Sequence, residues 1–213
     1  MKTKTMKEET ISMQDIIFAI PSMPKLAATL LNKGKDYDAL LIEILKTDYF
    51  SEDRHFPTPK ELQQKLNLSY GRFRKQINLL YEDFMKSISS PDTALVLGDK
   101  LCEIYVHYFH LETAFYARLS VLPKVGEQME LPFIRPLFRG HDLFHVQSVT
   151  HCVVNDRIDF KMWLTVGAFN LFEHLEKDHA KSENRFDFMN DRIIEGEHHR
   201  RRAELNAETR KFW

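Results

Sequence analysis

Residues 57–80 read PTPKELQQKLNLSYGRFRKQINLL, and they hold the most specific pattern in the chain. Thr58 and Glu61 suit a helix start, because a threonine at the cap and a glutamate three residues later bind each other's backbone N–H groups. Asn67 stands where the chain must turn sharply, at a left-handed position that asparagine tolerates. Ser69 can then cap a second helix. The segment therefore predicts a short helix, a tight turn and a longer helix.

The apolar residues of this segment lie at helical spacing and are expected to fill the crevice between the two helices. They are Leu62, Leu66, Leu68, Phe73, Ile77 and Leu80. This is the plan of a helix-turn-helix, whose second helix enters the major groove of DNA. The residues expected to project from the other faces of that helix, and to contact DNA, are Tyr70, Arg72, Arg74, Lys75, Gln76 and Asn78. Arginine can pair with guanine, and glutamine or asparagine with adenine.

Basic residues are concentrated in this region. Between Thr58 and Lys86 there are six Lys or Arg and three Asp or Glu, whereas the whole chain of 213 residues has 30 and 31, with a net charge of −1. A near-neutral chain is not expected to coat DNA or anionic lipid over its whole surface. A local basic face remains compatible with DNA binding.

At these residues the sequence resembles bacterial helix-turn-helix regulators, most closely winged-helix proteins of the gluconate-repressor (GntR) type. The resemblance covers residues 37–86. The matching positions are Pro57, Thr58, Glu61, Leu62, Leu66, Leu68, Ser69, Phe73, Arg74, Lys75, Ile77 and Leu80. The DNA contacts that it implies are Tyr70, Arg72, Arg74 and Lys75, and the residues that it places near phosphates are Lys60 and Ser69.

The family's wing, a glycine-rich hairpin directly after the second helix, is absent or altered in this sequence. Residues 93–108 can form a hairpin around Gly98 and Asp99, but at a longer spacing. Two other interpretations stay open: an amphipathic helix pair with a solvated basic face, or a helix-turn-helix that contacts protein rather than DNA.

Helices are also expected upstream of this segment. Apolar residues between Ile16 and Leu31 recur at helical spacing, but Pro21 and Pro24 interrupt them, which favours two short helices. The range 37–50 predicts one more amphipathic helix.

Beyond residue 90 the apolar period changes from 3.6 to 2, which is typical of strands. The clearest runs are 102–109, 115–121, 144–149 and 158–166. The apolar phase slips at Ser148 and Val149, which indicates a bulge. Five or so short strands favour a small antiparallel barrel or sandwich. This part of the chain is similar to uncharacterised bacterial β-domains, a resemblance that implies no activity.

The sequence thus predicts an α+β protein in four parts. They are a flexible N-terminus (1–13), a helical domain (14–90) with its helix-turn-helix at 58–84, a small β-domain (91–167), and a C-terminal helix with a charged tail (168–213). The tail contains the basic run His198-His199-Arg200-Arg201-Arg202, interpreted as a solvated helix because acids stand at pairing distance.

Several classes of protein are excluded. No window reaches the roughly 18 uncharged apolar residues of a membrane-spanning helix, and the first residues lack the apolar core of a signal peptide, so a cytoplasmic protein is expected. Two cysteines cannot form a disulfide scaffold. The ten histidines are scattered, and the common nucleophile, phosphate-loop and dinucleotide motifs are missing. We expect no enzyme activity, metal or cofactor.

The leading hypothesis is a sequence-specific DNA-binding protein, either a bacterial transcriptional regulator or a factor associated with mobile elements. Double-stranded DNA is the expected partner, and a homodimer is expected because symmetric regulators read two half-sites. No membrane partner is expected, and the sequence indicates no particular small-molecule effector. The alternative is a protein–protein interaction module in which the β-domain binds a partner or a ligand.

Overall fold

A computed structural model of the chain describes residues 11–52, 55–154, 157–167, 169–172, 175 and 179. The chain divides at residue 168, and every element named below lies before that division. The helices are α1 (Met13–Ala19), α2 (Pro24–Ala28), α3 (Asp38–Leu45), α4 (Pro59–Lys65) and α5 (Tyr70–Lys86), with 3-10 helices η1 (Ile20–Ser22), η2 (Pro91–Thr93) and η3 (Pro132–Phe138). The strands are β1 (Leu95–Leu97), β2 (Lys100–Tyr108), β3 (Leu111–Leu119), β4 (Gln128–Glu130), β5 (Leu143–Val154) and β6 (Arg157–Val166).

The first helices form as their sequence predicts. Ser12 caps α1 by accepting a hydrogen bond from the backbone N–H of Asp15, at 3.3 Å. Pro21 lies in η1, and Pro24 is the first residue of α2. Proline fits the first turn of a helix and breaks its interior, so the two short helices predicted between residues 16 and 31 are confirmed.

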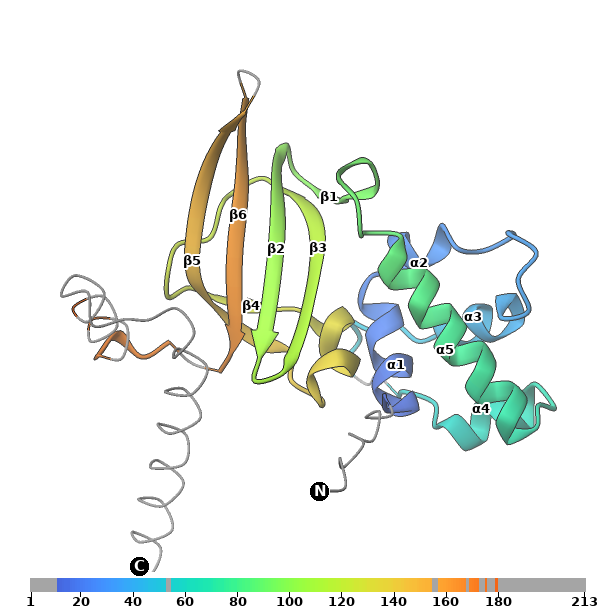
Figure 1. Cartoon of the computed structure of the whole chain (residues 1–213). Helices are drawn as coiled ribbons and strands as arrows, with labels where there is room; N and C mark the ends of the chain where they lie inside the picture. The colour runs from blue at the N-terminus through green and yellow to red at the C-terminus, as the bar shows by residue number, and fades with distance from the viewer. Residues whose placement is uncertain are drawn as a thin grey trace, which may run out of the picture. The chain divides into compact units, whose positions relative to one another are not determined.

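The six strands form one curled, half-barrel sheet, in the order β1-β3-β2-β6-β5-β4 (Figure 1). Strands β2 and β3 are an antiparallel hairpin, and so are β5 and β6. Two pairs are parallel, β1 with β3 and β2 with β6. The sheet is therefore mixed, and β1 and β4 are its two edges.

The α+β class is confirmed, but the prediction of an antiparallel barrel or sandwich is wrong in two respects. The sheet is mixed because the connection from β3 runs through β4, η3 and β5 before β6 returns beside β2. It does not close, because among the described strands β1 pairs only with β3 and β4 only with β5. Alternation of apolar residues indicates a strand and its buried face, but it carries no information about the partner or its direction.

The bulge predicted in the run 144–149 is confirmed. Val146 pairs with Leu164 and Ser148 with Trp163, so Gln147 is an extra residue on β5. The extra residue brings Val149, which packs against the core, to the inner face. Sequence phase alone was enough to find it.

One hydrophobic core joins the helices to the sheet. The inner face of the sheet contributes Cys102, Ile104, Val106, Phe115, Ala117, Phe144, Val146, Met162 and Leu164. The connecting 3-10 helix η3 packs on this face through Phe133, whose ring meets Phe115 at 5.2 Å. On its other side η3 meets α1, and Figure 1 shows α1 between η3 and α5. The helices α1 and α5 therefore pack against the sheet by way of η3.

Polar contacts reinforce this junction. The Arg135 guanidinium donates to Asp15 on α1 at 3.1 Å and to Asp142 at 3.0 Å, and it lies 4.6 Å from the centre of the Phe18 ring. The buried Tyr81 hydroxyl of α5 donates to the carbonyl of Phe133 at 3.0 Å. These bonds link α1 and α5 to η3.

Parts of the predicted organisation lie outside the described residues. They are most of the flexible N-terminus, where the description begins at residue 11, most of the C-terminal helix, and the charged tail with its basic run. None of the helices described is long and apolar enough to cross a membrane.

Candidate nucleic-acid interface

The start of α4 has the predicted capping box. The Glu61 backbone N–H donates to the Thr58 hydroxyl at 3.2 Å, and the Thr58 backbone N–H donates to the Glu61 carboxylate at 2.6 Å. The bond from the Thr58 backbone holds the pKa of Glu61 below its ordinary value. Such boxes satisfy two backbone donors that a helix start otherwise leaves unpaired. The residue at which α4 begins is therefore set by the local sequence.

The turn between the helices also forms as expected. Asn67 has a positive φ of 49°, which asparagine adopts at lower cost than most residues. The Leu68 backbone N–H donates to the carbonyl of Gln63 at 2.9 Å, which closes the end of α4. Ser69 then caps α5 by accepting from the backbone N–H of Arg72 at 3.4 Å. The short helix, tight turn and longer helix predicted for this segment are thus present.

The buried strip of α5 includes one residue that was expected on its surface. The buried members are Phe73, Gln76, Ile77, Leu80, Tyr81 and Phe84. Gln76 is only 6 % exposed, so the prediction that its side chain projects from an exposed face of α5 is wrong. It lies three residues after Phe73 and four before Leu80, in the middle of the strip that faces the core. Its polarity alone suggested the surface.

Most of the other predicted contact residues are accessible. Exposed side chains are those of Lys60, Ser69, Tyr70, Arg72, Lys75 and Asn78, and Arg74 is half-buried. Tyr70 is 56 % exposed, which is high for an aromatic ring. We name the exposed α5 residues Tyr70, Arg72, Lys75 and Asn78 the recognition face. Figure 1 shows the start of α5 beside α4, at the end of the helical group away from the sheet.

The cations of the recognition face differ in their partners from two lysines elsewhere in the helical region, Lys35 and Lys65. Lys65 pairs with Glu43 at 2.5 Å and Lys35 with Asp83 at 3.3 Å. Within the described residues, no carboxylate lies within salt-bridge distance of Arg72 or Lys75. Residues 70–81 contain no Asp or Glu at all. The positive end of the α5 dipole adds to this field, because the first turn of α5 has no acidic residue.

The C-terminal half of α5 is bound through Asp83 to residues that precede α3. Tyr37 is the residue before α3, and its hydroxyl donates a hydrogen bond to the Asp83 carboxylate at 2.8 Å. Lys35 forms an ion pair with the same carboxylate. Burial, together with the Asp83 carboxylate, raises the pKa of Tyr37 above its ordinary value, so the hydroxyl stays protonated as a donor. The second helix is thus fixed to α3 at one end and open at the other.

The hairpin that residues 93–108 could form around Gly98 and Asp99 is not present. Strand β1 pairs with β3 in parallel, and it does not pair with β2 to make a hairpin. Gly98 shows why the chain takes this path. A Cβ added there would lie 2.0 Å from the backbone nitrogen of Ser120, so only glycine allows the turn after β1 to pass so close to the end of β3.

Three features of this region were not predicted from the sequence. One is the Arg135 junction with Asp15 and Asp142, whose members are far apart in the chain. Another is the bridge from Glu43 to Lys46 and Lys65. The third is the burial of Gln76. Only the last had a usable signal, since its spacing from Phe73 and Leu80 is that of the apolar strip.

No candidate metal site is found among the residues that the structure describes. They contain no group of three or more His, Cys, Asp or Glu side chains that could hold a metal ion. Both cysteines are free, and burial raises the pKa of the Cys102 thiol to about 12. Cys102 is therefore neutral and unreactive at physiological pH.

Comparison with protein-family models, curated proteins and solved structures finds no match for this chain.

Proposed function

We propose that this chain is a sequence-specific, double-stranded DNA-binding protein, a transcriptional regulator or a factor associated with mobile elements. The observation that supports this most is the recognition face: an exposed helix start whose cations lack carboxylate partners within the described residues. Cations without partners in their own chain can neutralise phosphates and release counterions from DNA. The capped helix pair supplies a rigid support for them.

The residues take different roles in this proposal. Lys60 and Ser69, at the starts of α4 and α5, bind phosphates and set the register of the helix on the duplex. Arg72, Lys75 and Asn78 reach base edges, where each well-placed pair contributes about 1–3 kcal/mol of discrimination. The charges of Arg72 and Lys75 also neutralise the phosphates that border the groove. Tyr70 packs against sugar or a thymine methyl. Arg74, which is half-buried, contributes through its charge.

A homodimer in the cytoplasm is the assembly that we propose. Twofold symmetry lets two copies of α5 read half-sites about one helical turn apart, which raises specificity without new contacts in each copy. Because β1, the first strand after α5, pairs with β3 and forms no hairpin with β2, each copy contacts DNA without a wing in this proposal.

Fluorescence anisotropy of labelled duplexes tests this function. The protein is titrated at about 50 mM salt into DNA that flanks its own gene and into a random duplex of equal length. We expect tighter binding to the flanking DNA, weakened by Arg72→Ala and unchanged by Arg118→Ala on the sheet. Absence of binding to both duplexes would exclude the function.

One observation favours the alternative, a protein–protein interaction module. The edge strand β1 carries exposed apolar side chains, and that of Val96 is 72 % exposed. Val121, two residues after the end of β3, is 76 % exposed. An apolar strand at a sheet edge offers unpaired backbone groups to another chain. If the DNA titration fails, a Val96→Lys variant that loses association with a captured partner would support this second function.

A further inference from the structure

Gly71, the second residue of α5, differs from the other glycines that the structure describes. Most of those have a positive φ, which glycine adopts without steric cost; they are Gly34, Gly126, Gly140 and Gly167. At Gly98 the backbone of Ser120 leaves no room for a side chain. Gly71 has a helical backbone, and a Cβ added to it would meet nothing within 4 Å. Among the described glycines, it is therefore the one that neither backbone conformation nor packing requires.

This glycine is also unfavourable for the helix that contains it. Glycine is a poorer helix residue than alanine, because its backbone loses more conformational freedom on folding. The cap of α5 does not need it, since Ser69 accepts the hydrogen bond from the Arg72 backbone N–H. An alanine would fit the open space, keep the helical conformation and raise stability. No contact within the described chain accounts for the glycine.

The first turn of α5 is exposed on all sides. Residues 69–72 are four consecutive exposed residues, and the buried strip of the helix begins at Phe73. Successive residues of a helix are about 100° apart around its axis, so Gly71 lies between the directions of Tyr70 and Arg72. A molecule that contacts both of these side chains therefore passes over Gly71, where the main chain is not covered by a side chain.

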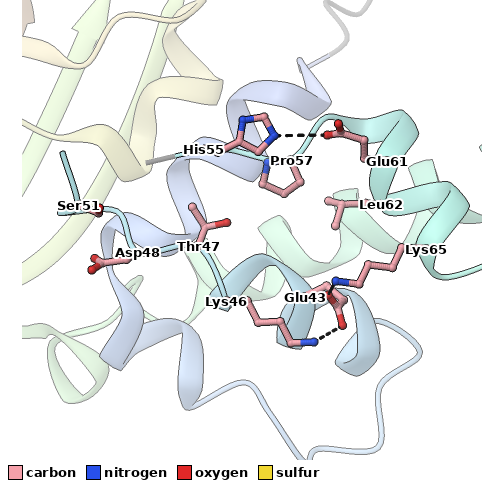
Figure 2. Close-up of a pocket in the computed structure, with 10 residues that line it drawn as sticks. All are labelled: Glu43, Lys46, Thr47, Asp48, Ser51, His55, Pro57, Glu61, Leu62 and Lys65. Atoms are coloured by element: carbon pink, nitrogen blue, oxygen red, sulfur yellow. Dashed lines mark hydrogen bonds and ion pairs between the residues drawn. The ribbon is translucent and has the colours of Figure 1, made fainter. Parts of the chain in front are cut away.

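The start of α5 is held in place from within the chain. The turn before it is closed by the Leu68 backbone N–H, which donates to the carbonyl of Gln63 at 2.9 Å. Lys65, at the end of α4, pairs with Glu43 of α3 at 2.5 Å, and Figure 2 shows this ion pair. Because α4 and the turn are fixed, a side chain added at the start of α5 would hold a bound molecule farther from the helix.

We propose that Gly71 is a positioning residue, which lets the main chain of α5 touch the sugar–phosphate backbone of duplex DNA. This close approach brings Tyr70, Arg72 and Lys75 within reach of phosphates and base edges. The inference rests on the proposed function and adds the point at which helix and DNA come closest. Contacts to the DNA backbone fix the register and orientation of a protein and carry no sequence information directly. A larger residue at this point should therefore weaken binding to every duplex, and more so as its size increases.

Two measurements on Gly71→Ala and Gly71→Leu test this role. Anisotropy titration uses the duplex that flanks the gene of this protein and the random duplex, and urea unfolding followed by circular dichroism measures stability. Gly71→Ala should raise the urea midpoint and yet weaken binding to both duplexes about tenfold, the scale of overpacking a close contact by one methyl group. Gly71→Leu should weaken binding further. A residue that served the fold alone would change stability and leave the affinity unchanged.

Gly34→Ala is the matched control, because Gly34 also has nothing within 4 Å but has a φ of 67°. Alanine is strained there, so this variant should be less stable and bind DNA normally while folded. Equal affinity of Gly71→Ala and the original protein would overturn the inference and leave the proposed function intact. A Gly71→Ala variant of lower stability would also overturn it, since the glycine would then serve the fold. Failure of the original protein to bind either duplex would overturn both.

Discussion

The recognition face of α5 and the outer face of the sheet both carry charged and aromatic side chains, but these side chains differ in their partners. On the sheet, Glu103 accepts hydrogen bonds from the Tyr116 hydroxyl at 2.8 Å and from Lys161 at 3.2 Å. Tyr105 stacks on Trp163, with ring centres 5.4 Å apart. We name these five residues the outer sheet cluster. On α5, Arg72 and Lys75 have no carboxylate partner among the described residues.

This difference separates charges that stabilise the fold from charges that are available to a partner. In the outer sheet cluster the ions neutralise each other, so little free energy is left to gain from binding another molecule. On α5 no carboxylate among the described residues offsets the positive charges of Arg72 and Lys75, so these charges can neutralise phosphates. Substitutions on the two surfaces should therefore act on different properties, one on stability and the other on binding.

The largest effect is expected beneath the recognition face. Phe73 is fully buried between the helices, and Phe73→Ala should lower the free energy of unfolding by about 3–5 kcal/mol, because it leaves a cavity in the core. Chemical denaturation measures the change. Lys75→Ala, two residues along the same helix but exposed, should change stability by less than about 0.5 kcal/mol. Equal effects of the two would contradict the orientation of α5.

The next effect concerns DNA affinity. Arg72→Ala combined with Lys75→Ala should weaken binding to duplex DNA by about 10- to 100-fold, since each lost base or phosphate contact removes about 1–3 kcal/mol. Thermal denaturation of this variant should match the unsubstituted protein. Anisotropy titration compares it with Glu103→Gln in the outer sheet cluster, which should bind DNA normally. DNA binding that depends on Glu103 instead would reverse the assignment of the two surfaces.

A smaller effect is expected on the sheet. Glu103→Gln should lower the free energy of unfolding by about 1 kcal/mol near neutral pH, because it removes the charge that Lys161 pairs with. Circular dichroism during urea unfolding measures this change. A variant as stable as the original protein would show that the cluster does not contribute to the fold.

The pH dependence of stability is the subtlest expected effect. Burial alone would raise the pKa of Glu103, but hydrogen bonds from Tyr105, Tyr116 and Lys161 together hold it below the ordinary value. A carboxyl group with a lowered folded-state pKa stabilises the protein above its unfolded pKa, and this contribution is lost as pH falls through the folded pKa. The stability difference between the original protein and Glu103→Gln should therefore shrink below about pH 4. A difference that is constant from neutral to acid pH would contradict this.

Local sequence predicted the helix pair well, because its signals lie within a few residues of the structures that they form. The capping box at Thr58 and Glu61, the left-handed turn at Asn67 and the cap at Ser69 all involve neighbours in the chain. The exception is Gln76, whose place in the buried strip depends on helical geometry and not on its polarity.

The sheet was predicted less well because its pairing joins distant residues. The parallel pairing of β2 with β6 brings residue 104 beside residue 162, and no short pattern in either strand records this choice. The same holds for β1, which Gly98 allows to pass close to Ser120. The ion pair of Glu43 with Lys65 depends on the packing of α3 against α4. Long-range contacts of this kind leave no local signal.

The central claim, that the recognition face binds DNA phosphates, is tested most directly by the salt dependence of DNA affinity. The logarithm of the association constant should fall linearly with the logarithm of salt concentration, with a slope of about −0.9 per phosphate contact. In the variant that combines Arg72→Ala with Lys75→Ala, the slope should be less steep, by an amount that corresponds to the loss of up to about two phosphate contacts. An affinity that does not respond to salt, or a slope that the double variant leaves unchanged, would contradict the claim.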